Sequence, residues 1–209
     1  MGLFSPRKSS TPSTTDKVWK NRTACLKGVA KESWASSKES KVPLVVTFFE
    51  EAQRALVEFL AANKIPFREV RSFEEIGRLE KNTLAVIKAQ EVNHGSGIHA
   101  EIDAAIFVLG HYPIAEVENK TLDALTMHFP GSRISFCLSR DDAFFSAFGS
   151  ENIRSLMEKL GMDEEECIEH GFVTKAIRNA QEKISKKVLV ETKAASEKEW
   201  FMKNVRDKD

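Results

Sequence analysis

The sequence predicts an α/β protein in which helices flank a parallel β-sheet, and two observations lead to this prediction. Short runs of apolar and β-branched residues recur along the chain, most clearly at residues 43–49 and 104–110. Runs that are apolar throughout are typical of strands that are covered on both faces. Segments with helical spacing of apolar residues alternate with these runs, which is the arrangement of βαβ units.

The expected elements follow one another along the chain. Asp16 is a residue type that caps helices, so a first helix is expected to start there and to run to about residue 36. Strands are expected at residues 43–49, 67–70, 82–89, 104–110 and 133–139. Further helices are expected at residues 50–63, 113–129 and 150–160. From about Phe172 one long helix can continue towards Asp209, although its apolar stripe becomes sparse beyond Val190.

The composition excludes several classes of protein. Lys and Arg together number 31, as do Asp and Glu, so the formal net charge is zero. A basic nucleic-acid binder needs a large field of one sign, so that class is not expected. The three cysteines lie far apart in the sequence and predict a reducing compartment without a disulfide framework. No apolar run approaches the roughly 20 residues of a membrane span, and no secretory leader is recognisable, so a soluble cytoplasmic protein is expected.

One compact polar cluster follows the third expected strand. His94, Gly95, Ser96 and Gly97 form a turn that could present backbone N–H groups to an anion, although a flexible surface turn explains the same residues. His94 and His99 could also bind a metal with Cys137 or His111, but scattered histidines make this the weaker interpretation, and no metal is expected. The phosphate-loop, nucleophile-elbow and dinucleotide motifs are absent. The residues alone therefore indicate a Rossmann-like or RecA-like domain without an evident active site or cofactor.

Several stretches resemble SecA, the bacterial preprotein translocase motor. Residues 143–162 (AFFSAFGSENIRSLMEKLGM) and 168–184 (IEHGFVTKAIRNAQEKI) are similar to the part of that family that follows its second RecA-like lobe. Residues 138–142 (LSRDD) resemble the family's L-S-x-E-D, and residues 130–132 (PGS) its P-G-S-S turn. Upstream, residues 16–20 (DKVWK), 43–47 (PLVVT) and 62–66 (ANKIP) resemble successive family segments in the right order.

The resemblance implies a domain organisation. Residues 16–170 correspond to the second RecA-like lobe, a P-loop NTPase-type parallel sheet flanked by helices. Residues 171–209 resemble the start of the family's long scaffold helix, and residues 1–15, rich in Ser and Thr, are expected to be disordered.

The departures from the family concern its catalytic parts. The first lobe, with its phosphate loop, is missing. The family's arginine motif corresponds here to residues 119–129, which contain no Arg, and its A-G-R-G-T-D loop corresponds to residues 93–99, which lack the Arg and the Asp. Loss of one catalytic arginine costs about 10³–10⁵ in rate in such enzymes. The stretch also lies in an acidic segment, since residues 111–170 hold twelve acidic and five basic residues. An enzyme is therefore not expected.

The sequence thus predicts a non-catalytic SecA-like helicase C-terminal lobe that acts as an accessory or protein-binding module, linked by kinship alone to protein translocation. Its partner would be a translocase component or a separate motor lobe. An alternative is the trans-acting half of an ATPase that docks on a separate first lobe, for which only Arg133 and Arg140 are near enough in sequence. A second alternative is a nucleic-acid-binding module derived from a helicase.

Overall fold

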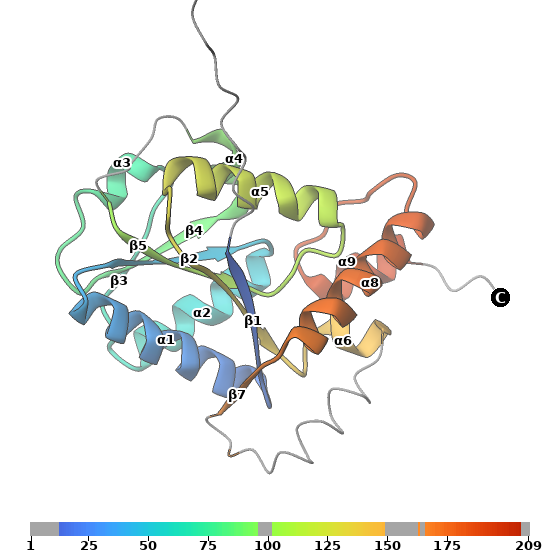
Figure 1. The fold of residues 1–209 in the computed structure, drawn as a ribbon, viewed down its shortest axis with the longest axis horizontal. Coiled ribbons are helices and arrows are strands. Elements are labelled where there is room, and N and C mark those ends of the chain that lie inside the picture. Colours follow the sequence, from blue (N-terminus) through green and yellow to red (C-terminus); the bar gives the residue numbers. More distant parts are fainter. Residues whose placement is uncertain (1–12, 96–101, 149–162, 164–165, 206–209) are drawn as a thin grey trace, which may run out of the picture.

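The computed structural model describes residues 13–95, 102–148, 163 and 166–205. These residues form a seven-stranded sheet in the order β3-β4-β2-β5-β6-β1-β7, in which the pairing of β1 with β7 is antiparallel and the other pairings are parallel. The predicted fold class, a largely parallel sheet flanked by helices, is confirmed (Figure 1). The strands are β1 (Thr14–Trp19), β2 (Val42–Thr47), β3 (Phe67–Glu69), β4 (Leu84–Lys88), β5 (Ala104–Leu109), β6 (Ile134–Ser139) and β7 (Cys167–Glu169).

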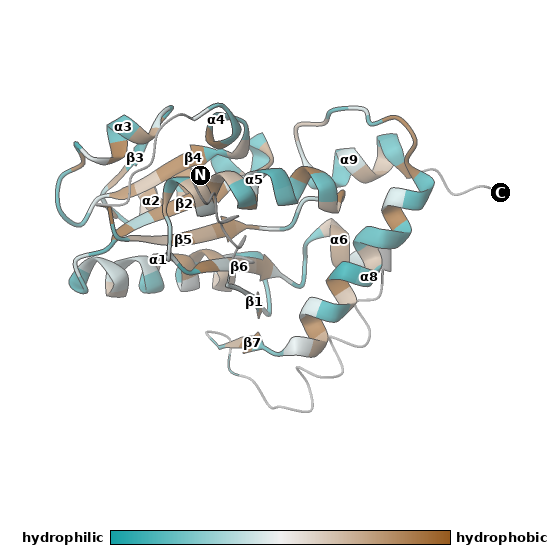
Figure 2. Ribbon diagram, turned by 45° about the horizontal axis from the view of Figure 1, so that its top comes forward, coloured by the Kyte–Doolittle hydropathy of each residue, from teal (hydrophilic) through white to brown (hydrophobic). Residues whose placement is uncertain are grey.

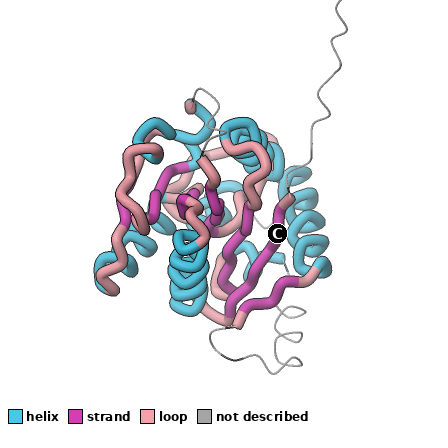
Figure 3. Tube along the Cα trace, turned by 60° about the vertical axis from the view of Figure 1, so that its left-hand side comes forward, coloured by secondary structure: helices cyan, strands magenta, loops and turns pink. Residues whose placement is uncertain are grey.

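Helices cover both faces of the sheet. Helices α1 (Arg22–Lys38) and α2 (Glu50–Ala62) lie on one face. On the other face lie α3 (Phe73–Ile76), α4 (Ala89–His94) and α5 (Ala115–His128), and the layers on either side of the strands are visible in Figure 3. Helices α6 (Ala143–Phe148), α8 (Gly171–Lys187) and α9 (Glu197–Asn204) lie together at one end of the molecule. Within the described ranges, no helix has both the length and the apolar content that crossing a bilayer requires.

The central strands form the core. Leu44, Val45 and Val46 of β2 and Ala85, Val86 and Ile87 of β4 are fully buried. The strands in the middle of the sheet are accordingly apolar along their length (Figure 2). This is the burial on both faces that the uninterrupted apolar runs predicted, because neighbouring strands and helices leave no solvent-facing side.

The start of the chain differs from the sequence prediction. Residues 14–19 form β1, which lies between β6 and β7, so the helix start expected at Asp16 is wrong, although α1 occupies most of the expected range. Val18 and Trp19 are buried in the sheet, and α1 begins only after Asn21. The expected disordered segment, residues 1–15, reaches into β1 at Thr14, and residues 1–12 lie outside the described residues.

We expect Asn21→Ala to lower the free energy of unfolding by about 1 kcal/mol. The side-chain oxygen of Asn21 accepts a hydrogen bond of 2.8 Å from the backbone N–H of Ala24, which would otherwise be an unpaired donor at the start of α1. Urea denaturation monitored by circular dichroism measures the change. Ser72→Ala is the matched control, because Ser72 occupies the same position at α3 without a side-chain capping bond. An equal loss in both variants would contradict this explanation.

The end of the chain also differs from the prediction. The single long helix is wrong, because α8 ends at Lys187 and α9 begins only at Glu197. The segment between them turns back, so that the backbone N–H of Glu51 donates to the carbonyl of Ala195 at 3.0 Å. Trp200 is fully buried as a result, whereas a continuous helix extending from the domain would leave this side chain in water. The helix expected at residues 150–160 lies outside the described residues.

Candidate functional site

A cleft of about 390 Å³ lies where β2, β5 and β6 end. In open parallel sheets, ligands bind beyond the carboxyl ends of the strands, so this is the first place to look for a site. Leu109 at the end of β5 and Gly110 directly after it line the cleft, as does Phe49 after β2. Charged side chains dominate the remaining lining: Arg22 from α1, Glu51 from α2, His111, Asp141 and Asp142 from the loops after β5 and β6, and Glu197 and Lys198 from α9.

Asp142 is the most buried carboxylate of the cleft. Its Oδ2 accepts a hydrogen bond of 2.8 Å from the backbone N–H of Ser139, which fixes the turn between β6 and α6. Its Oδ1 accepts no hydrogen bond and lies 3.4 Å from Nη2 of Arg22, with the Asp142 side chain 3% exposed. Burial raises the pKa of Asp142 above its ordinary value, although the charge of Arg22 opposes the shift.

Glu197 brings a second carboxyl group to the cleft from α9. Burial, together with the charge of Asp142, raises the pKa of Glu197 to about 8, although the backbone N–H groups of Phe144 and Ala143 at the start of α6 act in the opposite direction. Glu197 therefore releases its proton at a higher pH than an ordinary glutamate does. Functional sites often contain two neighbouring carboxyl groups that burial and mutual repulsion keep from being ionised at the same time.

A buried ionic centre lies behind the cleft, at His111. The His111 Nε2 is 2.9 Å from Oδ1 of Asp16 on β1, and its Nδ1 is 2.9 Å from Oε2 of Glu118 on α5. Burial alone would lower the pKa of His111, but the charge of Glu118 and hydrogen bonds to both carboxylates raise it to about 10. The imidazolium therefore donates to both acids, and its ring stacks on Phe136 at 3.9 Å between centroids. With both nitrogens engaged, this centre holds elements together and offers no free base for catalysis.

The same centre connects to the C-terminal helices. Nε2 of Gln181 on α8 donates to Oε1 of Glu118 at 3.1 Å and to the carbonyl of Tyr112 at 2.9 Å. The Tyr112 hydroxyl and the indole N–H of Trp200 both donate to Glu191. Helices α8 and α9 are thus linked by hydrogen bonds to the loop after β5, and α9 is held at the side of the cleft.

The structure describes only part of the anion-binding turn that the sequence predicts. His94 is exposed at the end of α4, and Gly95 follows it, whereas Ser96, Gly97 and His99 lie outside the described residues. A Cβ at Gly95 would lie 2.4 Å from the ring of Phe73, so close packing explains the glycine. In the described part of the chain no three His, Cys, Asp or Glu side chains are grouped to hold a metal.

The arginines singled out in the sequence lie at different ends of the sheet. Arg133 precedes β6 and lines a separate pocket at the amino ends of the strands, opposite the cleft. Arg140 follows the carboxyl end of β6, where its backbone N–H donates to the carbonyl of Trp19. Sequence reasoning missed the arginine that does line the cleft, Arg22. It also missed the two neighbouring carboxyl groups, Asp142 and Glu197, although Asp142 belongs to the LSRDD stretch.

The comparisons with known proteins agree with the resemblance seen in the sequence. The protein translocase subunit SecA of Desulfotalea psychrophila is 28% identical over 182 residues, which cover 81% of this chain and 21% of that protein. SecA of Campylobacter curvus is 28% identical over 186 residues, with the same coverage of both chains. The similarity to SecA is confirmed. A shorter stretch of 49 residues reaches 55% identity to SecA of Acidithiobacillus ferrooxidans.

The SecA similarity concerns one part of a larger protein. The chain spans about a fifth of the length of these SecA relatives, 21% for the first two. No family model matches the chain. Two solved structures are similar, each with a TM-score of 0.44. The C-terminal domain of a possible DNA helicase from Lactobacillus plantarum WCFS1 is 13% identical, and the match covers 64% of this chain and 76% of that one. The C-terminal part of the Fun30 ATPase domain is 10% identical, and the match covers 76% of this chain and 54% of that one.

Proposed function

We propose that this chain is a non-catalytic, SecA-like helicase C-terminal lobe that acts in the cytoplasm as an accessory, protein-binding module of protein translocation. Its similarity to SecA over most of its length supports the link to translocation. The lack of arginine in residues 119–129, which correspond to the family's arginine motif, supports the absence of catalysis.

The acidic lining of the cleft carries this proposal. Asp141, Asp142 and Glu51 face the position where a ligand of an open parallel sheet would sit, against Arg22 and Lys198. A triphosphate would meet these carboxylates at short range, and like charges in a partly buried cleft repel strongly. Residues 119–129, which correspond to the family's arginine motif, lie mainly in α5, where Thr121, Leu122 and Leu125 are buried against the core instead.

The arrangement of the arginines argues against the trans-acting ATPase. A motor completed in trans needs a guanidinium aimed at the phosphate across the lobe interface. Arg133 lies at the opposite end of the sheet from the cleft, and Arg22 is already paired with Asp142. Arg140 follows the carboxyl end of β6 but is not among the residues that line the cleft. Helix α9 also lies along the cleft, beside the surface that a second lobe would have to approach.

Titration with a fluorescent ATP analogue and magnesium tests the absence of catalysis. We expect no saturable binding to the purified chain, either alone or together with the SecA of the same cell, because the cleft repels phosphate. Tight magnesium-dependent binding, or ATP hydrolysis above that of the SecA alone, would overturn the proposal.

The same SecA, added to the immobilised chain, tests the accessory role. We expect binding that weakens in the variant Leu189→Ser with Val190→Ser, because these side chains are 93% and 85% exposed between α8 and α9. A matched variant, Met127→Ser on α5, removes an exposed apolar side chain on a different surface. Absence of binding to SecA would contradict the accessory role in translocation.

A further inference from the structure

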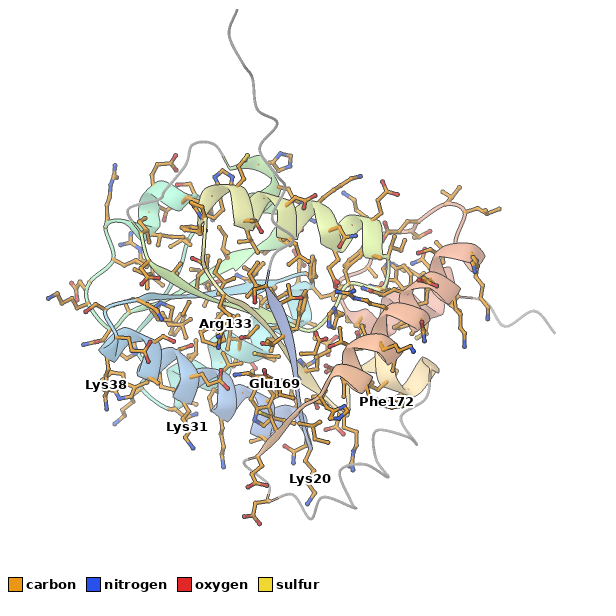
Figure 4. All side chains as sticks on the ribbon, in the orientation of Figure 1. Lys20, Lys31, Lys38, Arg133, Glu169 and Phe172 are labelled. Atoms are coloured by element: carbon orange, nitrogen blue, oxygen red, sulfur yellow. The ribbon has the colours of Figure 1, made fainter. Side chains whose placement is uncertain are left out.

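Helix α1 presents a row of exposed side chains on its outer face. Lys27, Lys31, Trp34 and Lys38 are all exposed, and they follow one another at intervals of four, three and four residues. At 3.6 residues per turn, these intervals place the four side chains within about 60° of one another around the helix axis and along about 16 Å of its length. We call these four residues the α1 stripe. Lys31 and Lys38 project outward from the helix (Figure 4).

The described neighbours of the α1 stripe leave its positive charge unpaired. The single acidic residue of α1, Glu32, is half-buried and pairs with Lys17 of β1, with 2.7 Å between Oε2 and Nζ. Glu39, directly after the helix, pairs with Lys41 at 3.0 Å. Within the described part of the chain, none of the three lysines of the stripe forms an ion pair with a carboxylate. The zero net charge of the whole chain therefore does not extend to this helix, whose outer face is positive.

Trp34 adds an aromatic surface to this row of charges. Its side chain is 50% exposed and lies between Lys31, one turn before it, and Lys38, one turn after it. The ammonium group of Lys38 is 5.6 Å from the centroid of the indole ring, a cation–π contact that keeps a positive charge beside the ring. A base stacked on the exposed part of the ring would therefore have a cation on each side along the helix to receive its neighbouring phosphates.

We propose that the α1 stripe binds a single-stranded nucleic acid, with phosphates on its three lysines and an unpaired base stacked on Trp34. Single-strand binding sites combine in this way cations that follow the backbone with aromatic rings on which bases stack. The groove of about 680 Å³ beside the stripe is lined by Lys31 but also by Glu166 and Glu169 at β7. These carboxylates repel phosphates, so the strand runs along α1 and not across it towards β7.

Two other anionic partners fit the α1 stripe less well. A helix that binds an anionic membrane buries a broad apolar face in the lipid, whereas the apolar face of α1, with Leu26 and Val29, is buried in the core of the protein. An acidic protein segment would pair with the lysines but would make no use of the indole ring. The combination of three unpaired lysines with an exposed aromatic ring therefore favours a nucleic acid.

Fluorescence anisotropy of a labelled single-stranded RNA of about 16 nucleotides, titrated with the full chain, tests the proposal. If three lysines meet phosphates, the logarithm of the association constant should fall with the logarithm of the salt concentration with a slope of about −2. This corresponds to a loss of affinity of about 20-fold between 50 and 200 mM salt. The same RNA annealed to its complement is the control ligand and is expected to bind more weakly, because paired bases cannot stack on Trp34. Absence of single-strand binding at 50 mM salt, or equal or tighter binding of the duplex, would overturn the proposal.

Variants separate stacking from charge. Trp34→Ala is expected to weaken single-strand binding about tenfold with little change in the salt slope, and Trp34→Phe to keep most of the affinity, because phenylalanine still stacks. Lys27→Gln combined with Lys31→Gln is expected to reduce the slope by about 1.4, since each phosphate contact contributes about 0.7. The matched control combines Lys81→Gln and Lys120→Gln, which are exposed before β4 and on α5, and should leave the slope unchanged. Equal effects of the two double variants would show that total charge governs binding and would contradict the proposal.

Two further ligands test the other anionic partners. Polyglutamate is expected to displace the RNA only at a much higher concentration of charge than unlabelled RNA does, and equal displacement would overturn the stacking role of Trp34. Vesicles of phosphatidylglycerol and phosphatidylcholine are expected not to bind. Vesicle binding that Trp34→Ala abolishes would assign the α1 stripe to a membrane surface instead. The SecA experiment varies Leu189 and Val190, which lie outside α1, so the two proposals can fail separately.

Discussion

Replacing His111 with leucine is expected to lower the free energy of unfolding by about 3–5 kcal/mol. The imidazolium is the charge that lies between Asp16 and Glu118, and all three side chains are buried. Without it, two carboxylates remain in the core without the cation between them, where they must either stay charged or take up protons. Either outcome costs more than the loss of the hydrogen bonds themselves.

Urea denaturation at pH 7 measures this effect. His94→Leu is the matched control, because His94 is exposed, and its change is expected to stay within about 0.5 kcal/mol. Adding Glu118→Gln to His111→Leu should recover part of the lost stability, since it removes one of the unpaired charges. Similar losses in the two histidine variants, or further loss in the double variant, would refute the ionic explanation.

The pH dependence of the wild type provides an independent check of the same centre. The pKa of His111 is raised in the folded state to about 10 from an ordinary value of 6.5, so the folded protein binds a proton that the unfolded chain releases. Its stabilisation is complete below pH 6.5 and is lost as the pH rises through about 10. The Leu variant should lack this alkaline decline.

Replacing Trp200 with alanine is expected to cost about 3–5 kcal/mol. Its ring is fully buried, packs edge-on against Phe201 at 5.3 Å between centroids, and donates its indole N–H to Glu191 at 2.6 Å. Because α9 is short and Trp200 is its one buried residue, the loss should appear first as detachment of the C-terminal segment.

Limited proteolysis combined with thermal denaturation distinguishes local from global loss. We expect cleavage between residues 188 and 205 in Trp200→Ala while the sheet remains folded. Trp34→Ala is the control, since Trp34 is 50% exposed on the outer side of α1, along which Lys31 and Lys38 also project (Figure 4). Unchanged resistance to proteolysis would mean that α9 is held by other contacts.

Five of the seven strands of the described sheet could be predicted from the sequence. The strands β2, β4 and β5 are nearly continuous apolar runs, whereas β3 is a short Phe-Arg-Glu segment with two exposed residues. Val45 and Val86, for example, are buried in strands that are covered on both faces, and so are the residues next to them along each strand. These strands therefore appear in the sequence as apolar runs without alternating polar residues. Strand β1 could not be predicted in this way, since Asp16 and Lys17 interrupt it and their partners lie in β6 and β7. Asp16 has the residue type of a helix cap, but in the fold its carboxylate meets His111.

The cleft was less predictable than the fold, because its charged residues come from segments that lie far apart in the sequence. Its charged residues come from α1, α2, α9 and the loops after β5 and β6, and each of these segments contributes only one or two of them. Only the turn back after Lys187 brings Glu197 to the cleft, and the sequence signs of that turn are weak, namely the fading apolar stripe and the late Trp200. The glycine turn at residues 94–97 was the more conspicuous pattern, yet neither of its described residues, His94 and Gly95, lines the cleft.

The position of β1 has a consequence for biosynthesis. Thr15 pairs beside Ser135, 120 residues later in the chain, so the first strand leaves the ribosome long before its neighbour exists. At about 5–20 residues per second, this delay is roughly 6–24 s. During that time β2 to β5 can assemble, whereas β1 remains an unpaired strand with its tryptophan exposed. Nascent chains of this protein are therefore expected to need a chaperone until β6 is complete.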